Sequence, residues 1–242
     1  MPDNRSGPPS KAALFFRLAW TVVSIVVVQT IVCGLAMVPA VALWAFVASL
    51  PVSILTRLLL FSGIAIPSTV AFAVTLLIVS PIATWVTRTR TPANLELRIA
   101  DMSWPLMTWA RYMVAIHIVR VFAGTLFRGS PFWTAYLRLN GARLGRGVYI
   151  NTLHISDHNL LDFGDQVIIG SEVHVSGHTV ESGVVKTGNV RLGDQVTVGL
   201  GTTIEIGVVA GDRCQIGALS FVPKHTALDA GAVYVGSPVR RI

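Results

Sequence analysis

The feature that most constrains this chain is a six-residue repeat in its C-terminal part. An aliphatic residue, usually followed by glycine, recurs at every sixth position over six units: Leu192-Gly193, Val198-Gly199, Ile204-Glu205, Ala210-Gly211, Ile216-Gly217 and Val222-Pro223. Four positions after each first residue stands a small or β-branched residue, and an earlier block beginning near Leu144 follows the same rule. An amphipathic helix has a period of about 3.6 residues and an alternating strand a period of about 2, so neither explains this spacing.

A period of six is typical of a triangular solenoid. One aliphatic side chain per unit points to the axis of a prism, and the next residue lies where the chain turns a corner. Three such faces make a coil of about 18 residues, and stacked coils bury a continuous aliphatic ladder. The spacing therefore predicts an all-β left-handed parallel β-helix of about four coils over residues 140–242. The register breaks at 180–191, and an extra residue falls near 158–161. Excursions from a solenoid are frequent places for function.

The N-terminal half is apolar instead of repetitive. No charged residue lies between Arg17 and Arg57 or between Arg57 and Arg88, and the whole chain has 52% hydrophobic and only 13% charged residues. Each uncharged stretch exceeds the roughly 20 residues that cross a bilayer. We expect an α-helical membrane hairpin within residues 19–90, with spans near 19–47 and 58–83. The alternative is a buried helical hairpin of a soluble protein.

The distribution of basic residues predicts the orientation of this hairpin. The net charge is +7, and many arginines flank the apolar runs instead of clustering with aromatic residues. This arrangement favours anionic lipid headgroups over nucleic acid as a partner. The positive-inside rule then places both termini and the β-helix in the cytoplasm, as parts of a multi-pass inner-membrane protein. Residues 1–18 are the expected cytoplasmic tail, and the apolar run is too long for a cleavable signal.

Residues 91–139 have a mixed character. Arginines recur among tryptophans, tyrosines and aliphatic residues, with Pro105 and Pro131 as breaks. The pattern favours an amphipathic helical linker at the headgroup level. Helices packed directly on the C-terminal domain are the alternative, and both descriptions can hold at once.

The repeat region resembles the hexapeptide-repeat acyltransferases. The segments GDQVIIGSEVHVSGHT, RLGDQVTVGLGTTI and GSPVRRI are similar to those of maltose and galactoside O-acetyltransferases. The order of two spans and one hexapeptide domain resembles more closely the C-terminal region of nonribosomal peptide synthetases of the ε-poly-L-lysine synthetase type. The segments LRLNGARLGRGVYINT and HTVESGVVKTGNVRLGD carry this second resemblance. Those synthetases also have adenylation and carrier regions, which are not found among these residues.

The excursion supplies the candidate catalytic residues. His178 points away from the prism axis by its register and opens the excursion; the resemblance implies that it is the general base. Glu181, three residues later, is expected to orient or pair with the imidazole. Asp157 and His158, one coil earlier, and Lys186 in the excursion are candidates for substrate binding. For each, a surface or structural role is the alternative. The spacing matches no metal motif.

The resemblance also implies the substrates and the assembly. The acyl donor is expected to be a thioester on coenzyme A or on a carrier protein's phosphopantetheine arm, with no tightly bound cofactor. A hydroxyl or an amine is the acceptor. A homotrimer is expected, with the 180–191 excursion reaching across the cleft between subunits. The competing hypothesis is a non-catalytic, membrane-tethered trimeric scaffold or partner subunit of a peptide synthetase-like system.

Overall fold

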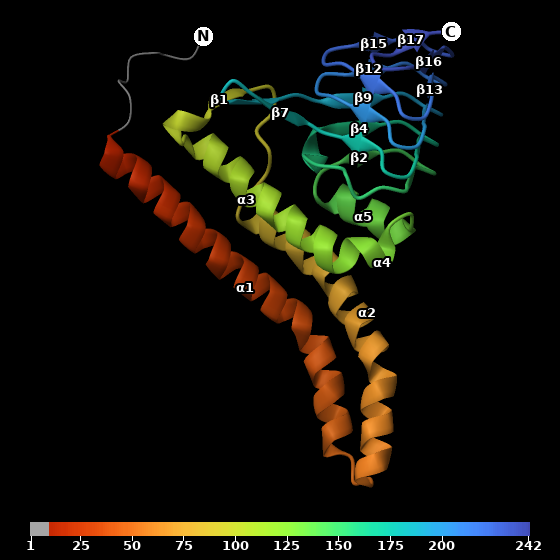
Figure 1. Ribbon diagram of the computed structural model, residues 1–242. Helices are drawn as coiled ribbons and strands as arrows, with labels where there is room; N and C mark the ends of the chain where they lie inside the picture. Colours follow the sequence, from red (N-terminus) through yellow and green to blue (C-terminus); the bar gives the residue numbers. More distant parts are fainter. Residues whose placement is uncertain (1–9) are drawn as a thin grey trace.

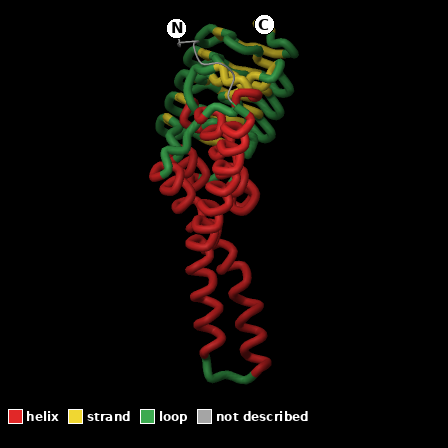
Figure 2. The backbone as a smooth tube through the Cα atoms, turned by 90° about the vertical axis from the view of Figure 1, so that its left-hand side faces the viewer, coloured by secondary structure: helices red, strands yellow, loops and turns green. Residues whose placement is uncertain are grey.

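The computed structural model describes residues 10–242, so half of the expected tail at 1–18, with Arg5, lies outside the described residues. Two long helices, α1 (Lys11–Ser49) and α2 (Ile54–Val86), form a hairpin that projects as a shaft from the rest of the molecule (Figures 1 and 2). The hydroxyls of Ser10 and Ser53 cap the two helices by accepting backbone N–H groups of Ala13 and Thr56. Such caps satisfy donors that have no partner within the helix.

The linker is largely helical and lies between the hairpin and the β-helix (Figure 1). Helix α3 (Trp104–Val119) continues through a π-helical turn, Arg120–Gly124, into α4 (Thr125–Phe127), and α5 (Pro131–Leu139) follows. α3 packs against α1, α2 and the short strand β1 (Glu96–Arg98). Three segments are long and apolar enough to cross a membrane, namely α1, α2 and Trp104–Phe127. The linker that we expected to be amphipathic therefore contains a third helix of this kind.

The C-terminal half consists of short strands separated by tight corners. Their bounds are β2 Arg143–Leu144, β3 Tyr149–Ile150, β4 Leu161–Phe163, β5 Ile168–Ile169, β6 His174–Val175, β7 His178–Glu181, β8 Val184–Thr187, β9 Val190–Leu192, β10 Thr197–Val198, β11 Thr203–Ile204, β12 Val209–Ala210, β13 Gln215–Ile216, β14 Phe221–Val222, β15 Ala227–Leu228, β16 Val233–Val235 and β17 Arg240–Arg241. All of these strands except β7 and β8 form three sheets, in the orders β17-β16-β13-β10-β5-β3, β14-β11-β6 and β15-β12-β9-β4-β2, whereas β7 and β8 form a separate sheet with β1. These are the three faces of the predicted prism.

The pairing register reproduces the predicted coil. Val198 pairs in parallel with Ile216, and Ile204 with Val222, so the chain returns to the same face after one full coil. Ile169, by contrast, pairs with Val198 across a much longer stretch, because the 180–191 excursion lies between them. The left-handed β-helix and the predicted break in its register are confirmed.

Both repeated positions of each unit fill the axis. The aliphatic residues Val175, Ile204 and Val222 are almost fully buried, as are the small residues Thr202 and Cys214. Carboxylates stack along one corner: the backbone N–H groups of Arg146, Asp165 and Asp194 donate to the side chains of Asp165, Asp194 and Asp212. These three acidic residues thus have a structural role in satisfying corner amides.

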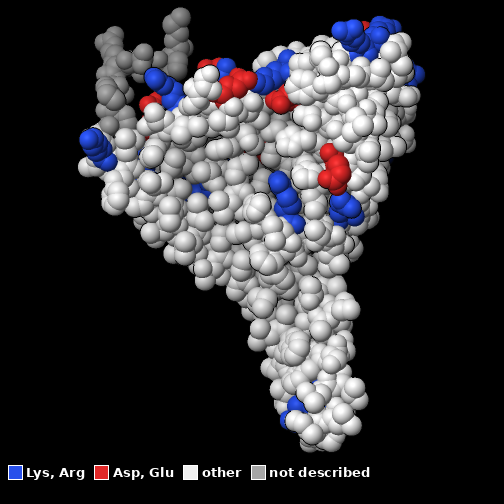
Figure 3. Space-filling model, in the orientation of Figure 1, with Lys and Arg blue, Asp and Glu red and all other residues white. Residues whose placement is uncertain are grey.

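The surfaces of the two halves differ. Lys, Arg, Asp and Glu gather over the β-helix and the top of the linker, and the shaft shows almost none apart from a basic group near its tip (Figure 3). The shaft exposes large apolar side chains such as Leu55, Leu59 and Ile66. An exposed apolar surface of this extent needs an apolar partner.

Candidate active site

The candidate base, His178, is held by a buried carboxylate. His178 is the first residue of β7, directly after the corner at Ser176 and Gly177. Its Nδ1 lies 2.6 Å from Oδ2 of Asp157, on the preceding coil. The imidazole is 22% exposed and the carboxylate is fully buried. The structure therefore brings together two residues that the sequence had suggested for separate roles.

Asp157 is fixed from several sides. Thr91 Oγ1 donates to Oδ1 over 2.6 Å, and Ser156 Oγ donates to Oδ2 over 2.8 Å. Burial by itself would raise the pKa of Asp157, but the hydrogen bond and charge of His178, with those from Thr91 and Ser156, hold the pKa below its usual range. The residue adopts a left-handed conformation, with φ of 52°. It is therefore an ionised acceptor in a preset position.

This arrangement defines the imidazole tautomer. A carboxylate beside Nδ1 retains the proton on that nitrogen and leaves a lone pair on Nε2. Ser176 adds to the constraint, because its hydroxyl donates to the His178 carbonyl over 2.7 Å. Gly177 is needed between them: a Cβ there would lie 2.7 Å from the Cβ of Asp157. The geometry is that of a general base with an orienting acid.

The helical half closes one side of the imidazole. The indole of Trp109, on α3, meets the His178 ring edge to face, with centroids 5.0 Å apart and an angle of 69°. Thr91, which holds Asp157, also belongs to the linker. The sequence analysis missed both residues, as well as Ser156 and Ser176. The contacts of Thr91 and Trp109 depend on packing between the two halves, and those of Ser156 and Ser176 depend on how the coils stack, so no periodicity of the sequence points to them.

The excursion folds onto its own chain. β7 and β8 form a hairpin around Ser182 and Gly183, and β8 pairs in antiparallel register with β1 of the linker. Val185 is buried in a small core with Leu97, Leu106 and Met107. We expected this excursion to reach across a cleft to a neighbouring subunit. In the structure its outer strand is instead paired within the chain.

The expected contact between Glu181 and His178 is wrong. Residues three apart on a strand point to opposite faces, and Glu181 instead forms ion pairs with Lys224 and with Lys186, at 3.7 Å from the latter. Asp157 occupies the orienting position beside the imidazole.

Substrate contact by Asp157 or His158 is also wrong, because both side chains are buried. His158 lies between the rings of Tyr112 and Tyr136, with centroids 6.0 and 5.6 Å away. Burial is the main reason that its pKa falls to about 4, although the charge of Asp157 acts in the opposite direction. His158 is therefore a neutral core residue that helps to join the helical linker to the β-helix.

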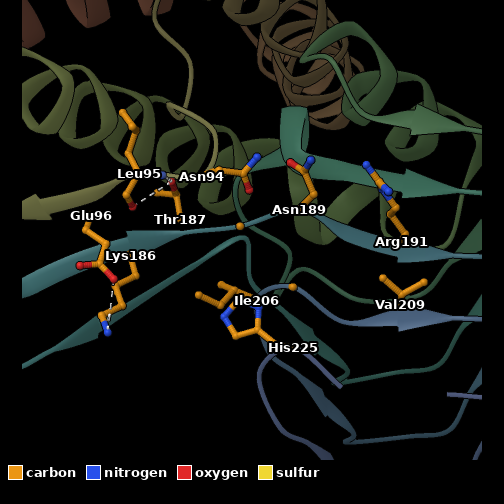
Figure 4. Close-up of a pocket in the computed structure, with 12 residues that line it drawn as sticks. Asn94, Leu95, Glu96, Lys186, Thr187, Asn189, Arg191, Ile206, Val209 and His225 are labelled. Carbon is orange, nitrogen blue, oxygen red and sulfur yellow. Dashed lines mark hydrogen bonds and ion pairs between the residues drawn. The ribbon is translucent and has the colours of Figure 1, made fainter. Parts of the chain in front are cut away.

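A cavity of about 420 Å³ lies beside the hairpin of β7 and β8 (Figure 4). Its lining comes from the linker, the excursion and two later coils, and includes Lys186, Arg191 and His225. Lys186 Nζ lies 3.6 Å from Glu96 Oε1 on the rim. Thr187, which also lines the cavity, is the cross-strand partner of His178. The cavity is thus basic and adjoins the candidate base. Among residues 10–242, no cluster of three His, Cys, Asp or Glu side chains is arranged to hold a metal ion.

Comparison with known proteins finds relatives of the repeat region. A delta-poly-L-ornithine synthetase of Acinetobacter baumannii is 30% identical over 150 residues, which is 61% of this chain and 11% of the synthetase. A galactoside O-acetyltransferase of Escherichia coli is 35% identical over 107 residues, which is 41% of this chain and 52% of the enzyme. A mitochondrial gamma carbonic anhydrase 2 of Arabidopsis thaliana is 30% identical over 47% of this chain and 41% of its own length. The chain thus spans about a tenth to a half of these curated relatives.

Solved structures give a similar result. A maltose O-acetyltransferase from Clostridium difficile has a TM-score of 0.43 at 21% identity, covering 58% of this chain and 88% of that one. A serine acetyltransferase from Neisseria gonorrhoeae has a TM-score of 0.41 at 16% identity, covering 71% and 56%. No protein-family model matches the chain. The repeat and the stacked coils make the C-terminal half a hexapeptide-repeat β-helix, and its sequence is similar to that of a galactoside O-acetyltransferase and to part of a delta-poly-L-ornithine synthetase.

Proposed function

We propose that the chain is a membrane-anchored acyltransferase, which moves an acyl or aminoacyl group from a thioester to a hydroxyl or amine. The observation that carries this proposal is the 2.6 Å contact between His178 and the buried Asp157, at the start of the excursion. A purely structural β-helix has no need of a partly exposed imidazole held by an ionised buried acid. Galactoside O-acetyltransferase, a named relative, carries out group transfer of this class.

The geometry supports the following steps. Nε2 of His178 accepts the proton of the acceptor O–H or N–H as that oxygen or nitrogen attacks the thioester carbonyl carbon. The tetrahedral intermediate then collapses, the C–S bond breaks, and the leaving thiolate takes the proton back from His178. Asp157 orients the ring throughout and stabilises its charged form.

The basic cavity is the proposed place for the donor. Coenzyme A and a phosphopantetheine arm both carry phosphate, and Lys186 and Arg191 supply positive charge beside the hairpin of β7 and β8. Lys186 is 37% exposed, so its ammonium group can exchange Glu96 for a phosphate oxygen. Thr187, which lines this cavity, is the cross-strand partner of His178, and this pairing supports a donor site beside the candidate base.

The bilayer is the proposed anchor for the helical half. The exposed apolar surface of α1 and α2 and the flanking arginines support a cytoplasmic inner-membrane location, with both termini and the β-helix in the cytoplasm. Reporter fusions at residues 52 and 242 test this orientation. A C-terminal reporter that is active only outside the cytoplasm contradicts it.

The proposed assembly is a homotrimer. Apolar side chains remain exposed on the β-helix, among them Leu200 and Leu219, which lie on one corner of adjacent coils. Packing this corner against a second copy would bury them, and cyclic symmetry closes such contacts. The mass of the detergent-solubilised protein, after subtraction of detergent, tests this assembly, which a stable active monomer would exclude.

Catalysis is tested with the purified full chain. Acetyl-coenzyme A and aminoacyl-pantetheine thioesters are offered with hydroxyl and amine acceptors, and thiol release is followed with product formation. His178→Ala should reduce turnover by about 10²–10⁴-fold, the usual contribution of a general base. His174→Ala, an exposed imidazole on the preceding strand, is the matched control and should retain turnover. Equal, substantial rates for the wild type and His178→Ala would refute the role of His178, and wild-type turnover no faster than the uncatalysed reaction would favour the scaffold hypothesis.

A further inference from the structure

A second polar site lies in the helical half, on the side of α3 that faces α1 and α2. A cavity of about 270 Å³ opens between α1, α2 and α3, near the ends of the hairpin that adjoin the β-helix. Its lining alternates apolar residues with hydroxyl, amide and guanidinium groups: Trp20, Ser24, Ile25, Val28, Gln29, Ser80, Ala83, Thr84, Thr87, Thr89, Arg111 and Ala115. This cavity is separate from the candidate active site. Trp109, which contacts His178, and Arg111 are two residues apart on α3, so their side chains lie on different faces of the helix.

Of the described residues that line this cavity, only Arg111 is charged. Its Nε donates to Ser24 Oγ over 2.9 Å, and one terminal nitrogen lies 3.5 Å from Thr21 Oγ1. Within residues 10–242, it forms no ion pair with a carboxylate. A guanidinium among apolar helices requires a counter-charge or a polar partner, so such a residue marks a functional site in a membrane protein.

The remaining lining groups suit a hydrated, anionic ligand. Gln29 Oε1 is buried without a hydrogen-bond partner in the described structure, and this acceptor suits a hydroxyl of a headgroup. Thr87 and Thr89 also line the cavity, and their Oγ1 atoms are hydrogen-bonded to each other over 2.8 Å. The half-exposed indole of Trp20 lies at the edge, where amphipathic aromatic rings contact the boundary between headgroups and acyl chains. The lining thus offers polar groups for a headgroup and apolar groups for the adjoining acyl chains.

We propose that this cavity binds the headgroup of an anionic phospholipid such as phosphatidylglycerol, with Arg111 as the counter-charge of the phosphate and Gln29 Oε1 as the acceptor of a headgroup hydroxyl. Basic pockets between membrane helices on the cytoplasmic side commonly take such headgroups. The lipid would join the three helices around a guanidinium that has no carboxylate partner among residues 10–242. α3 also carries Trp109, so the bound lipid would support the helix that closes the candidate active site.

Native mass spectrometry of the detergent-solubilised full chain tests this site. The protein is equilibrated with dioleoylphosphatidylglycerol or dioleoylphosphatidylcholine, and retained lipid is measured at rising collision energy. The wild type should retain phosphatidylglycerol in preference to phosphatidylcholine. Arg111→Gln should reduce this retention about fivefold, the effect of about one charge near a membrane surface. Arg88→Gln, which removes an exposed charge at the end of α2, is the matched control and should retain the lipid.

A second variant separates lipid loss from misfolding. Gln29→Leu retains Arg111 and replaces the amide by an apolar group of similar volume, so it should weaken retention while the circular dichroism spectrum stays unchanged. Equal retention of the two lipids by the wild type would overturn the proposal, as would full retention by both Arg111→Gln and Gln29→Leu. Displacement of the lipid by millimolar inorganic phosphate would overturn the assignment to a lipid.

Discussion

The two halves of the molecule bury apolar side chains in opposite ways. Each coil of the β-helix directs its aliphatic residues to a shared axis, so that Ile204 is 0% exposed. The hairpin directs many of its apolar residues outward, and Ile66 is 76% exposed. The β-helix contains its own hydrophobic core, whereas the hairpin relies on its surroundings to cover its apolar side chains. The candidate active site lies where they meet, since Asp157 and His178 come from the β-helix and Thr91 and Trp109 from the helical half.

The largest expected effect concerns the acid on the β-helix side of this junction. Asp157→Asn should lower kcat by about 10²–10⁴-fold and leave KM nearly unchanged, because an amide can donate to Nδ1 and so favours the tautomer with its proton on Nε2. Steady-state kinetics with the thioester assay measure both constants. A variant with full kcat would show that His178 does not depend on the buried carboxylate.

A paired substitution tests the contrast in burial directly. Ile204→Ala should lower the free energy of unfolding by about 2–5 kcal/mol, because it leaves a cavity in the aliphatic ladder. Ile66→Ala removes the same atoms from an exposed surface of the shaft and should change stability by less than about 0.5 kcal/mol. Thermal unfolding in one detergent compares the two variants. Similar losses of stability in the two variants would mean that Ile66 packs in a protein core, which would contradict its exposure on the shaft.

Acid should weaken the contact between the halves. His158 has a pKa of about 4 in the folded chain, below the usual value of about 6.5 that it regains on unfolding. The unfolded chain therefore binds more protons between these pH values. The contribution of neutral His158 is complete above about pH 6.5 and is lost as pH falls towards 4, by about 3 kcal/mol in all.

Unfolding measured across this pH range gives the comparison for His158. His158→Gln cannot titrate, so its stability should fall less steeply with acid than that of the wild type. Parallel curves for the two proteins would refute a neutral, buried His158.

The smallest effect is expected on the helical side of the active site. Trp109→Ala should lower kcat/KM by about tenfold, or about 1.4 kcal/mol, because the imidazole loses the aromatic edge that limits its movement. Trp109→Phe should restore most of the activity. If neither variant differs from the wild type, then the β-helix alone positions His178, and the junction only anchors the domain.

The sequence singled out His178 as the candidate base but did not predict its surroundings. His178 was identifiable because it follows the strict repeat and opens the excursion. Its partner was assigned to Glu181 from proximity in the chain, although the strand turns that side chain towards Lys224. Asp157 appeared to be one of several polar residues on an earlier coil, and only the stacking of coils brings it to Nδ1. The contribution of Trp109 depends on where α3 packs, which no periodicity encodes.

The β-helix and the two long helices follow from the sequence by itself, because each depends on a local rule. A strict period of six defines which residues face the axis, and long uncharged runs define helices suited to a bilayer. The tertiary structure alone decided how the linker is used. Pairing of β1 with β8, the buried hydrogen bond from Thr91 and the indole on His178 join residues far apart in the chain. Such contacts depend on the relative placement of the two halves, and this placement is set by side-chain packing that a one-dimensional pattern does not contain.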